Sequence, residues 1–246
     1  MKKNIFGLIL FISFIPSLIG AGFPASYYEI VDIKEQKKVF LNHLYTMIEK
    51  ENVQILRDRE LIKNTLSNNL FNTNYHSDNF GKLLILQRKY RVKSILSLDE
   101  FLNKIDIIPP SLALAQAAVE SGWGKSRFVK EANNIYGHWT FGEKGLVPQN
   151  RDEDKKHKIR IFNSLQTSVR AYMLNLNSNR AYHLFRSTRT QLRNTNLAPT
   201  GNKLSHTMRN YSGIGNKYLK MLNNLIDKQK LSKFDNKFYN KLNQNI

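Results

Sequence analysis

The chain has 246 residues, of which 41% are hydrophobic and 11% aromatic, and it carries a formal net charge of +19. A chain of this size and composition can bury one substantial core, which excludes a disordered tail and allows a smaller helical subdomain beside the core. It contains no cysteine, which excludes disulfides, thiolate catalysis, cysteine-ligated zinc and a thioether-linked lipid anchor.

The first residues have the order of a signal peptide. Lys2 and Lys3 precede an uncharged run from Ile5 to Ile19, and small residues at positions 20 to 22 follow this run. The apolar run is shorter than the about 20 residues that a membrane span needs, which favours cleavage over a retained anchor. We therefore predict a signal peptide over 1–22 and a mature protein exported to the periplasm or cell envelope.

Positive charge is concentrated in the last part of the chain. Residues 180–246 contain 13 Lys and Arg residues against Asp227 and Asp235. Outside the cytoplasm such a surface suits anionic polymers or lipid head groups, and an ordinary solvated basic face is the alternative. Nucleic acid is a poor candidate partner for an exported chain without a zinc finger, an RNP-type aromatic motif or a Walker loop. Peripheral membrane contact through the basic C-terminal residues stays a candidate interaction.

Residues 23–96 are expected to form an N-terminal helical extension. Apolar residues recur there at helical spacing in two groups, which predicts two helices. The groups are Val39, Phe40, Leu44, Met47 and Ile48, and then Ile55, Leu56, Leu61 and Ile62. The role of the segment 31–90 stays open between covering a groove and bracing a helical lobe.

A central domain is expected over 97–226, and a short helix opens it. Ser97 and Glu100 stand in capping-box register, so this helix should begin at Ser97 and end before Pro109-Pro110. The two prolines mark the entry to the next segment.

The segment that follows is an apolar helix that ends on an acid. From Ser111, which can serve as its N-cap, the sequence LALAQAAV is apolar nearly all round, as is typical of a helix inside a protein or under a cleft. Gly122 and Gly124 disfavour further helix. Glu120 is therefore expected on the last turn of a buried helix.

A small sheet and further helices are expected after this helix. The segments 133–141 and 157–162 alternate in polarity, which predicts an antiparallel sheet with a long polar connecting loop. Asn163 or Ser164 should cap an amphipathic helix, and a last helix should precede a loosely held basic helix or tail over 227–246. The apolar positions are Leu165, Val169, Tyr172, Met173 and Leu176 in the first helix, and Tyr218, Leu219, Leu222, Leu225 and Ile226 in the second.

Glu120 is a candidate general acid. Its neighbours Val119 and Trp123 are apolar, and removing a carboxyl from water disfavours its charged form and raises its pKa. A carboxyl that stays protonated near neutral pH can donate a proton to a leaving oxygen, as the acids of glycosidases do. On composition alone, the better interpretation is an ion pair between Glu120 and Lys125 or Arg127 at the helix end.

The sequence around Glu120 resembles a known family. The string LALAQAAVESGWGKSRFVKEANNIYGHW is similar to the glucosaminidase domain of bacterial peptidoglycan hydrolases, glycoside hydrolase family 73. The hallmark of that family is a helix ending in Ala-Leu-Glu-Ser-Gly-Trp-Gly, followed by Asn-Asn-Leu-Phe-Gly. The wider chain, from Ile33 to Ile226, looks most like its Bax-like branch. The resemblance implies a mostly helical, lysozyme-like α+β fold, in which a helical lobe and a small β-lobe enclose a groove for a glycan strand.

The resemblance also implies a pair of catalytic acids. The glutamate at the helix end, here Glu120, is the general acid. The second acid of the family lies on the β-lobe shortly before a strand, and the matching region here is NRDEDKKHKIRIF. Glu153 is the preferred candidate, Asp152 and Asp154 are near alternatives, and Glu143 is the least favoured. A solvated loop tip is the alternative interpretation of this acidic run.

A tyrosine in a Tyr-Ala-Thr-Asp motif also lines the groove in that family. Tyr211 matches the tyrosine, but Ser212 replaces the alanine and the Thr-Asp pair is absent, which puts in doubt any role of that aspartate here. Tyr211 is expected to orient water or the acetamido group of the substrate. Simple aromatic packing is the alternative.

Five further residues are candidates for substrate binding. Aromatic rings can stack on the apolar faces of sugars, although a large aromatic side chain also suits a core. The candidates are Trp139, Tyr136, Asn134, Trp123 and Tyr218. Trp139 is expected nearer the groove and Trp123 in the core beneath Glu120, while Asn134 can instead bond backbone or shape a turn.

We predict an exported endo-β-N-acetylglucosaminidase that acts on the glycan strands of peptidoglycan. No cofactor is required, and a metal site is not expected because His138 and His157 lack a second histidine at ligand spacing. The rival interpretations are a lytic transglycosylase, a muramidase on the same fold, and a non-catalytic wall-binding module. Of the two reaction types, hydrolysis needs a base to deliver water, whereas transglycosylation uses a hydroxyl of the sugar itself.

Overall fold

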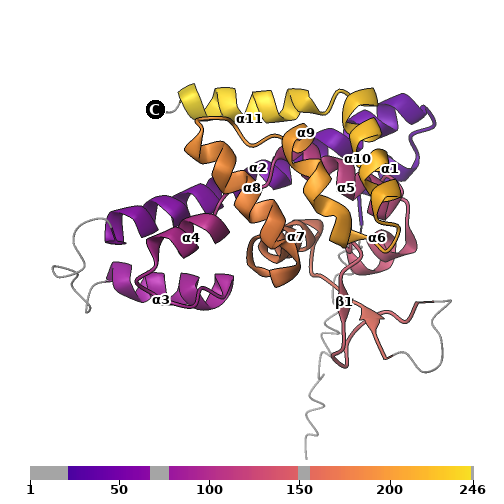
Figure 1. Cartoon of the computed structure of the whole chain (residues 1–246). Helices are drawn as coiled ribbons and strands as arrows, with labels where there is room; N and C mark the ends of the chain where they lie inside the picture. The colour runs from indigo at the N-terminus through magenta and orange to yellow at the C-terminus, as the bar shows by residue number, and fades with distance from the viewer. Residues whose placement is uncertain (1–21, 67–77, 149–155, 245–246) are drawn as a thin grey trace, which may run out of the picture.

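A computed structural model of the chain describes residues 22–66, 78–148 and 156–244. These residues form a helical body from which a small two-stranded sheet projects (Figure 1). In chain order the elements are α1 (Ala25–Tyr28), α2 (Ile33–Leu66), α3 (Asp78–Tyr90), α4 (Leu98–Lys104), α5 (Pro110–Ser121), α6 (Arg127–Ala132), β1 (Trp139–Thr140), β2 (Lys158–Ile159), α7 (Leu165–Ser178), η2 (Arg180–Tyr182), α8 (His183–Asn194), α9 (Gly201–Leu204), η3 (Ser205–Tyr211), α10 (Asn216–Lys228) and α11 (Ser232–Gln244). The mostly helical α+β class is confirmed. The predicted signal peptide, apart from Gly22, lies outside the described residues.

Helix α5 is the buried helix that the sequence predicts. Its residues from Pro110 to Ala118 are all buried, and it contacts α2, α9, α10 and α11. Ser111, which was expected as the N-cap, lies inside the first turn instead, because Pro110 occupies the first helical position, where proline needs no N–H partner. The helix ends at Ser121, where Gly122 adopts the left-handed backbone conformation with φ +55 that favours glycine.

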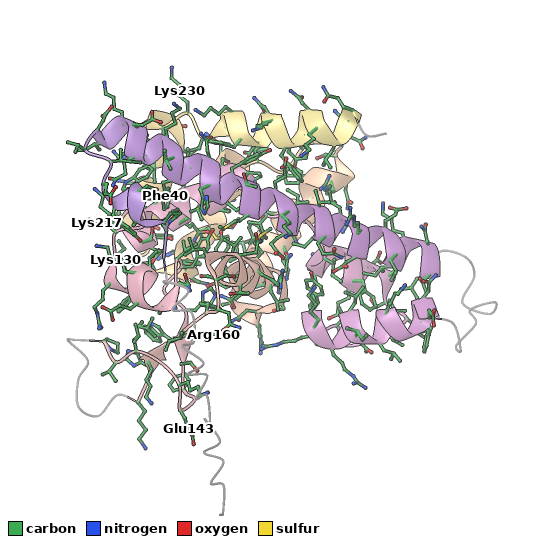
Figure 2. The ribbon with its side chains drawn as sticks, turned by 180° about the vertical axis from the view of Figure 1, so that it is seen from behind. Phe40, Lys130, Glu143, Arg160, Lys217 and Lys230 are labelled. Carbon is green, nitrogen blue, oxygen red and sulfur yellow. The ribbon has the colours of Figure 1, made fainter. Side chains whose placement is uncertain are left out.

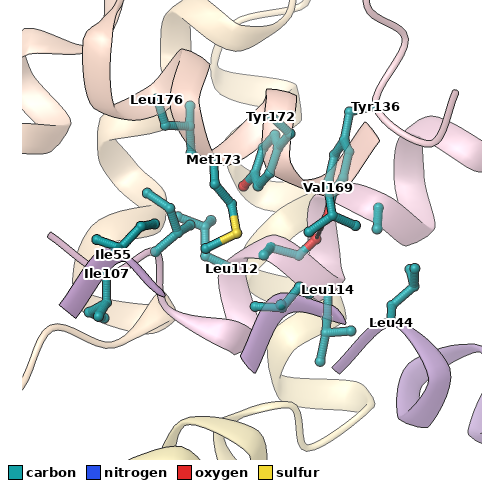
Figure 3. Packing of buried hydrophobic residues seen from close by; sticks show 14 of the residues in the cluster. Leu44, Ile55, Ile107, Leu112, Leu114, Tyr136, Val169, Tyr172, Met173 and Leu176 are labelled. Atoms are coloured by element: carbon teal, nitrogen blue, oxygen red, sulfur yellow. Dashed lines mark hydrogen bonds between the residues drawn. The ribbon is translucent and has the colours of Figure 1, made fainter. Parts of the chain in front are cut away.

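One long helix replaces the two helices expected in the N-terminal extension. Helix α2 runs without a break over 34 residues, because neither Gly nor Pro separates its two apolar groups. Its buried face includes Leu44 and Ile55 and contacts α5 and α7. Figure 3 shows both residues in the same packed cluster as Leu112 of α5 and Val169 of α7. The extension therefore shares the core of the helical body.

The C-terminal residues form a docked helix rather than a loosely held tail. Helix α11 contacts α5 and α9 and buries Phe234, Asp235 and Phe238. The Asp235 carboxylate accepts hydrogen bonds from the Ser111 N–H at 2.8 Å, the Ser111 hydroxyl at 2.6 Å and the Gly201 N–H at 3.0 Å. Because the first N–H groups of a helix lack intrahelical partners, these bonds fix the start of α5 against α11.

Helix α8, which the sequence patterns did not predict, is held by the buried Arg189 and the partly exposed Arg193. The Arg189 side chain is fully buried and donates to the carbonyls of Asp106 and Ile107, at 2.9 Å each, and of Asn103 at 2.8 Å. Arg193 pairs with the Asp106 carboxylate at 2.9 Å. Burial lowers the pKa of Arg189 to about 10, so its guanidinium still carries its charge at neutral pH. These bonds tie α8 to the segment that leads into α5.

The sheet is smaller than the alternation of the sequence predicted. Strands β1 and β2 are antiparallel and contain two residues each, with Trp139 opposite Ile159 and Thr140 opposite Lys158. The segment before β1 turns instead of extending, because Asn133 and Gly137 both adopt positive φ values, 53 and 68. Both strands lie within the segments that the sequence predicted, and they are antiparallel as expected.

Two predicted helix caps are confirmed. The Ser97 side chain accepts a hydrogen bond from the Glu100 N–H at the start of α4, and Ser164 forms a capping box with Thr167 at the start of α7. The apolar helix predicted around Tyr218 is α10. In the described part of the chain, no helix is both long enough and apolar enough to span a bilayer.

Candidate active site

We define the β-lobe as the described residues of 137–162, which are 137–148 and 156–162. A groove of about 1110 Å³ lies between α7 and this β-lobe. Its lining comes from segments that lie far apart in the sequence. The lining residues used below are Arg91, Glu120, Tyr136, Trp139, Arg160, Arg170 and Tyr211. Glu120 is the only acidic residue that lines the groove among those described. Within the same ranges, no three His, Asp or Glu side chains are grouped to hold a metal ion.

Glu120 lies on the last turn of α5 and is half-buried at the groove wall. Burial raises the pKa of its carboxyl, and a hydrogen bond from the Tyr218 hydroxyl to Oε1, at 2.8 Å, acts in the opposite direction. Burial is the larger influence, so the pKa lies above its usual value. The ion pair with Lys125 or Arg127 that composition favoured does not form: Arg127 pairs with Glu131 at 3.3 Å instead.

A directional chain of hydrogen bonds leads to Glu120. The Tyr172 hydroxyl donates to Gln116 Oε1 at 2.7 Å, and Gln116 Nε2 donates to the Tyr218 hydroxyl at 3.0 Å, which in turn donates to Glu120. Gln116 lies one helical turn before Glu120, so α5 presents both side chains on one face. The other carboxyl oxygen, Glu120 Oε2, has no hydrogen-bond partner among the described residues and can carry the acidic proton.

Tyr211 lies beside this chain and lines the groove. Its ring stacks on the ring of Tyr218, with centroids 5.7 Å apart and an interplanar angle of 5°. Its hydroxyl donates to the Tyr136 carbonyl at 3.3 Å. Burial raises the pKa of Tyr211 well above its usual value, so the phenol stays neutral and can act as a hydrogen-bond donor. A role in orienting water or the acetamido group stays a prediction.

Comparison with known proteins identifies the family. Residues 97–243 match the glucosaminidase family, which is described as mannosyl-glycoprotein endo-beta-N-acetylglucosaminidase, and this match covers more than half of the chain. The chain belongs to the glucosaminidase family. Protein bax of Escherichia coli (strain K12) is 30% identical over 188 residues, which are 74% of this chain and 66% of that protein. This relative confirms the Bax-like resemblance, and the chain spans slightly less than two thirds of its length.

A solved structure is also similar. It is a C-terminally truncated glycoside hydrolase domain from Salmonella typhimurium FlgJ, with 24% sequence identity and a TM-score of 0.37. The similarity covers 50% of this chain and 84% of that domain.

The second acid expected of a glucosaminidase is not placed by the structure. Glu153, Asp152 and Asp154 lie outside the described residues, so their assignment stays a prediction. Glu143 is exposed, does not line the groove, and lies at the end of the β-lobe that points away from the helical body (Figure 2). Glu143 is thus poorly placed to act with Glu120.

Two of the five candidate sugar-binding residues line the glucosaminidase groove. The Trp139 side chain is 62% exposed and stacks on His157, with ring centroids 4.4 Å apart. Tyr136 is buried, and its ring stacks on Tyr172 at 3.8 Å. Trp139 is therefore the better placed of the two to contact a sugar face.

Trp123 does not line the groove and lies in the core, as the alternative interpretation of this candidate predicted. It packs edge-on against Phe40 of α2 with ring centroids 5.5 Å apart, and Lys37 Nζ lies 4.8 Å from the centre of its ring. The positive φ of 58 at Trp123 turns the chain away at the end of α5, so the ring joins the core and not the groove. Phe40 is labelled within the helical body in Figure 2.

Asn134 and Tyr218, which were also predicted to contact substrate, do not line the groove. Asn134 is buried, and its amide donates to the carbonyls of His138 at 2.9 Å and Arg160 at 2.8 Å, so it joins the two sides of the sheet. This agrees with the alternative that it bonds backbone. Tyr218 is only 1% exposed and does not line the groove, so it positions Glu120 instead.

Sequence reasoning missed Gln116 and Arg91. Gln116 is a fully buried amide in an otherwise apolar helix, and that isolated polar residue is the signal that could have revealed it. Arg91 comes from the N-terminal extension and lines the groove with Glu120. No local pattern indicates that the segments of Arg91 and Glu120, which are distant in the sequence, line the same groove.

Proposed function

We propose that this chain is an exported endo-β-N-acetylglucosaminidase that cleaves the glycan strands of peptidoglycan, with Glu120 as the general acid. The observation that carries the proposal is a carboxyl of raised pKa at the wall of an open groove, oriented by a buried tyrosine. Membership of the glucosaminidase family supports the reaction class. The groove, at about 1110 Å³, is larger than most sites for small ligands, which suits a polymer.

In the proposed reaction, Glu120 donates its proton to the glycosidic oxygen as the bond from that oxygen to the anomeric carbon breaks. A water molecule attacks the anomeric carbon, and a carboxylate of the acidic run, preferably Glu153, removes its proton. Tyr211 orients the water or the acetamido group. The products are a reducing N-acetylglucosamine end and a free hydroxyl on the departing sugar. No cofactor takes part.

The test is the substitution Glu120→Gln. The amide keeps the size of the side chain but cannot protonate the leaving oxygen, so release of reducing ends from purified peptidoglycan should fall about 100- to 10,000-fold. The matched control is Glu131→Gln, which makes the same change at an exposed acid outside the groove and should leave activity unchanged. Activity of Glu120→Gln within tenfold of the wild type would remove Glu120 from the acid role.

The new ends of the fragments separate the rival reactions. A glucosaminidase in labelled water gives reducing N-acetylglucosamine ends that contain the label, whereas a muramidase gives labelled muramic acid ends. A lytic transglycosylase gives anhydro-muramyl ends without label, since a hydroxyl of the sugar replaces water. Binding without any new ends would identify a wall-binding module.

The proposal includes a peripheral contact of α11 with an anionic envelope surface. Lys233, Lys237 and Lys241 are exposed on α11 at intervals of four residues, and Lys230 in the preceding turn points away from the body (Figure 2). Lys241 also pairs with Glu49 of α2 at 3.1 Å. The double change Lys233→Gln/Lys237→Gln should weaken sedimentation with anionic vesicles and leave neutral vesicles unaffected. Equal sedimentation of the wild type and the double variant with anionic vesicles would exclude this contact.

A further inference from the structure

The groove has a positive lining that cleavage of a glycosidic bond does not itself require. Arg91, Arg160 and Arg170 line it, while Glu120 is the single acid in the described lining. These arginines come from the turn after α3, from the residue after β2 and from α7. An N-acetylated sugar backbone is neutral, so it offers no negative charge for three guanidinium groups to bind.

Among the described residues, Arg170 has an ion-pair partner, whereas Arg91 and Arg160 have none. Arg170 forms a two-point ion pair with Glu51 of α2, with nitrogen–oxygen distances of 3.0 to 3.2 Å. The guanidinium groups of Arg91 and Arg160 form no ion pair or hydrogen bond with any described residue. The Arg160 guanidinium lies 4.8 Å from the centre of the Phe162 ring, and this contact holds the cation beside the groove.

The backbone at Arg91 is held in an uncommon conformation. Its φ is +55, a left-handed value that glycine adopts more readily than arginine. Its N–H donates to the Arg88 carbonyl at 3.3 Å, and its own carbonyl accepts a hydrogen bond from Lys104 Nζ. Lys104 also pairs with Glu100 at 2.9 Å, which fixes the turn against α4. The turn therefore presents an arginine to the groove from a defined position.

Arg91 and Arg160 reach the groove from opposite sides of α7. Helix α3, which ends just before Arg91, and the sheet, which ends just before Arg160, flank α7 in Figure 1 and again in Figure 2. A strand that lies along α7 can thus meet both cations. Planar guanidinium groups bind carboxylates through two parallel hydrogen bonds, which neutral hydroxyl or acetamido groups cannot match in strength.

We infer that Arg91 and Arg160 bind carboxylates carried on the sugar substituents of the strand, so that the N-terminal extension contributes to substrate preference. The inference rests on the proposed function for the identity of the strand. In peptidoglycan such carboxylates have two sources: the peptide stems, and the lactyl group of muramic acid once a stem has been removed. A neutral polymer of N-acetylglucosamine has neither source.

The experiment compares kcat/KM on three substrates: stem-bearing strands, strands freed of their stems, and neutral N-acetylglucosamine oligomers. In Arg91→Gln/Arg160→Gln, the ratio of kcat/KM on stem-bearing strands to that on the neutral oligomer should fall about tenfold, through KM. The matched control is Arg88→Gln/Arg209→Gln, which removes two exposed arginines outside the groove and the same net charge. In the control, the ratio should stay within about twofold of the wild type.

Each outcome decides the inference. If kcat/KM, relative to that on the neutral oligomer, falls only on stem-bearing strands, the carboxylates belong to the stems. If it falls equally on strands freed of their stems, they belong to the lactyl group. An unchanged ratio, or the same fall in the control, overturns the inference. If the wild type cleaves none of the substrates, the proposed function fails on its own. In that case, binding of stem-bearing strands is measured for Glu120→Gln alone and for Glu120→Gln combined with the two arginine changes. A Kd about tenfold higher in the combined variant supports the inference, and an equal Kd overturns it.

Discussion

The hydroxyl of Tyr218 connects the buried core to the proposed acid, and Tyr218→Phe removes that one atom. In the wild type this hydroxyl donates to Glu120 Oε1 at 2.8 Å and accepts from Gln116 Nε2 at 3.0 Å. The phenylalanine ring keeps the stacking on Tyr211, so the fold is expected to survive. The substitution therefore separates positioning of the acid from packing of the core.

Two effects of different size follow from Tyr218→Phe. A hydrogen bond to a charged group contributes about 1.5–3 kcal/mol, and its loss destabilises the ionised form of Glu120. The pKa of Glu120, already raised by burial, must then rise further. In addition, Gln116 Nε2 loses its buried acceptor, which should lower the free energy of unfolding by about 1–3 kcal/mol.

The assay is the pH profile of kcat/KM together with urea denaturation. The acid works in its protonated form, so activity is lost as pH rises through its pKa, and a higher pKa moves the alkaline limb to higher pH. The control is Tyr172→Phe, which removes a hydroxyl bonded to Gln116 Oε1 but not to Glu120, and should destabilise the protein without the same shift. An alkaline limb that stays in place or moves to lower pH in Tyr218→Phe would refute the reasoning.

Three further substitutions test the framework around the site by urea denaturation. Asp235→Ala leaves the buried N–H and hydroxyl of Ser111 without an acceptor, while the Gly201 N–H keeps the Ser111 hydroxyl oxygen at 3.1 Å. This change should lower the free energy of unfolding by about 3 kcal/mol, whereas the exposed Asn236→Ala should change it by less than about 0.5 kcal/mol. Gly201→Ala places a Cβ 2.1 Å from the Ser111 hydroxyl oxygen, so it should destabilise the protein by about 1–3 kcal/mol, and unchanged stability would show that α9 moves freely. Burial lowers the pKa of His138 from 6.5 to about 4, so between these pH values the unfolded chain binds a proton that the folded protein does not. The wild type should therefore lose stability as pH falls from 6.5 to about 4. His138→Gln should lose less, and parallel curves for the two proteins would contradict this.

The features that the sequence predicted correctly depend on neighbouring residues. The caps at Ser97 and Ser164 and the end of α5 at Gly122 each follow from side chains within one helical turn. The position of Glu120 on the last turn follows in the same way. Its raised pKa was predicted from loss of water around the carboxyl, and burial is the larger influence on this pKa in the structure.

The features that the sequence missed depend on contacts between distant residues. The Tyr218 hydroxyl meets Glu120 across 98 positions of the chain, and no periodic pattern says which distant side chains will meet. The docking of helix α11 was missed because its lysines dominate its composition, although Phe234 and Phe238 recur at helical spacing and are buried. The strands were predicted too long because local alternation does not reveal that Asn133 turns the backbone.

An apolar helix that ends on an acid makes physical sense once the surroundings of α5 are considered. The helix contacts α2, α9, α10 and α11. At its end, the Ser121 hydroxyl donates to the Ala117 carbonyl at 2.6 Å and accepts from the Gly124 N–H at 2.8 Å. One turn earlier, the same face of the helix is fully buried, and a neutral amide, Gln116, occupies that position. A carboxylate there would be deprived of water and of access to substrate. At position 120 the carboxyl is buried enough for a raised pKa and open enough to face the groove. The two side chains therefore differ in what they can do: the Gln116 amide orients the Tyr218 hydroxyl, and only the Glu120 carboxyl can donate a proton.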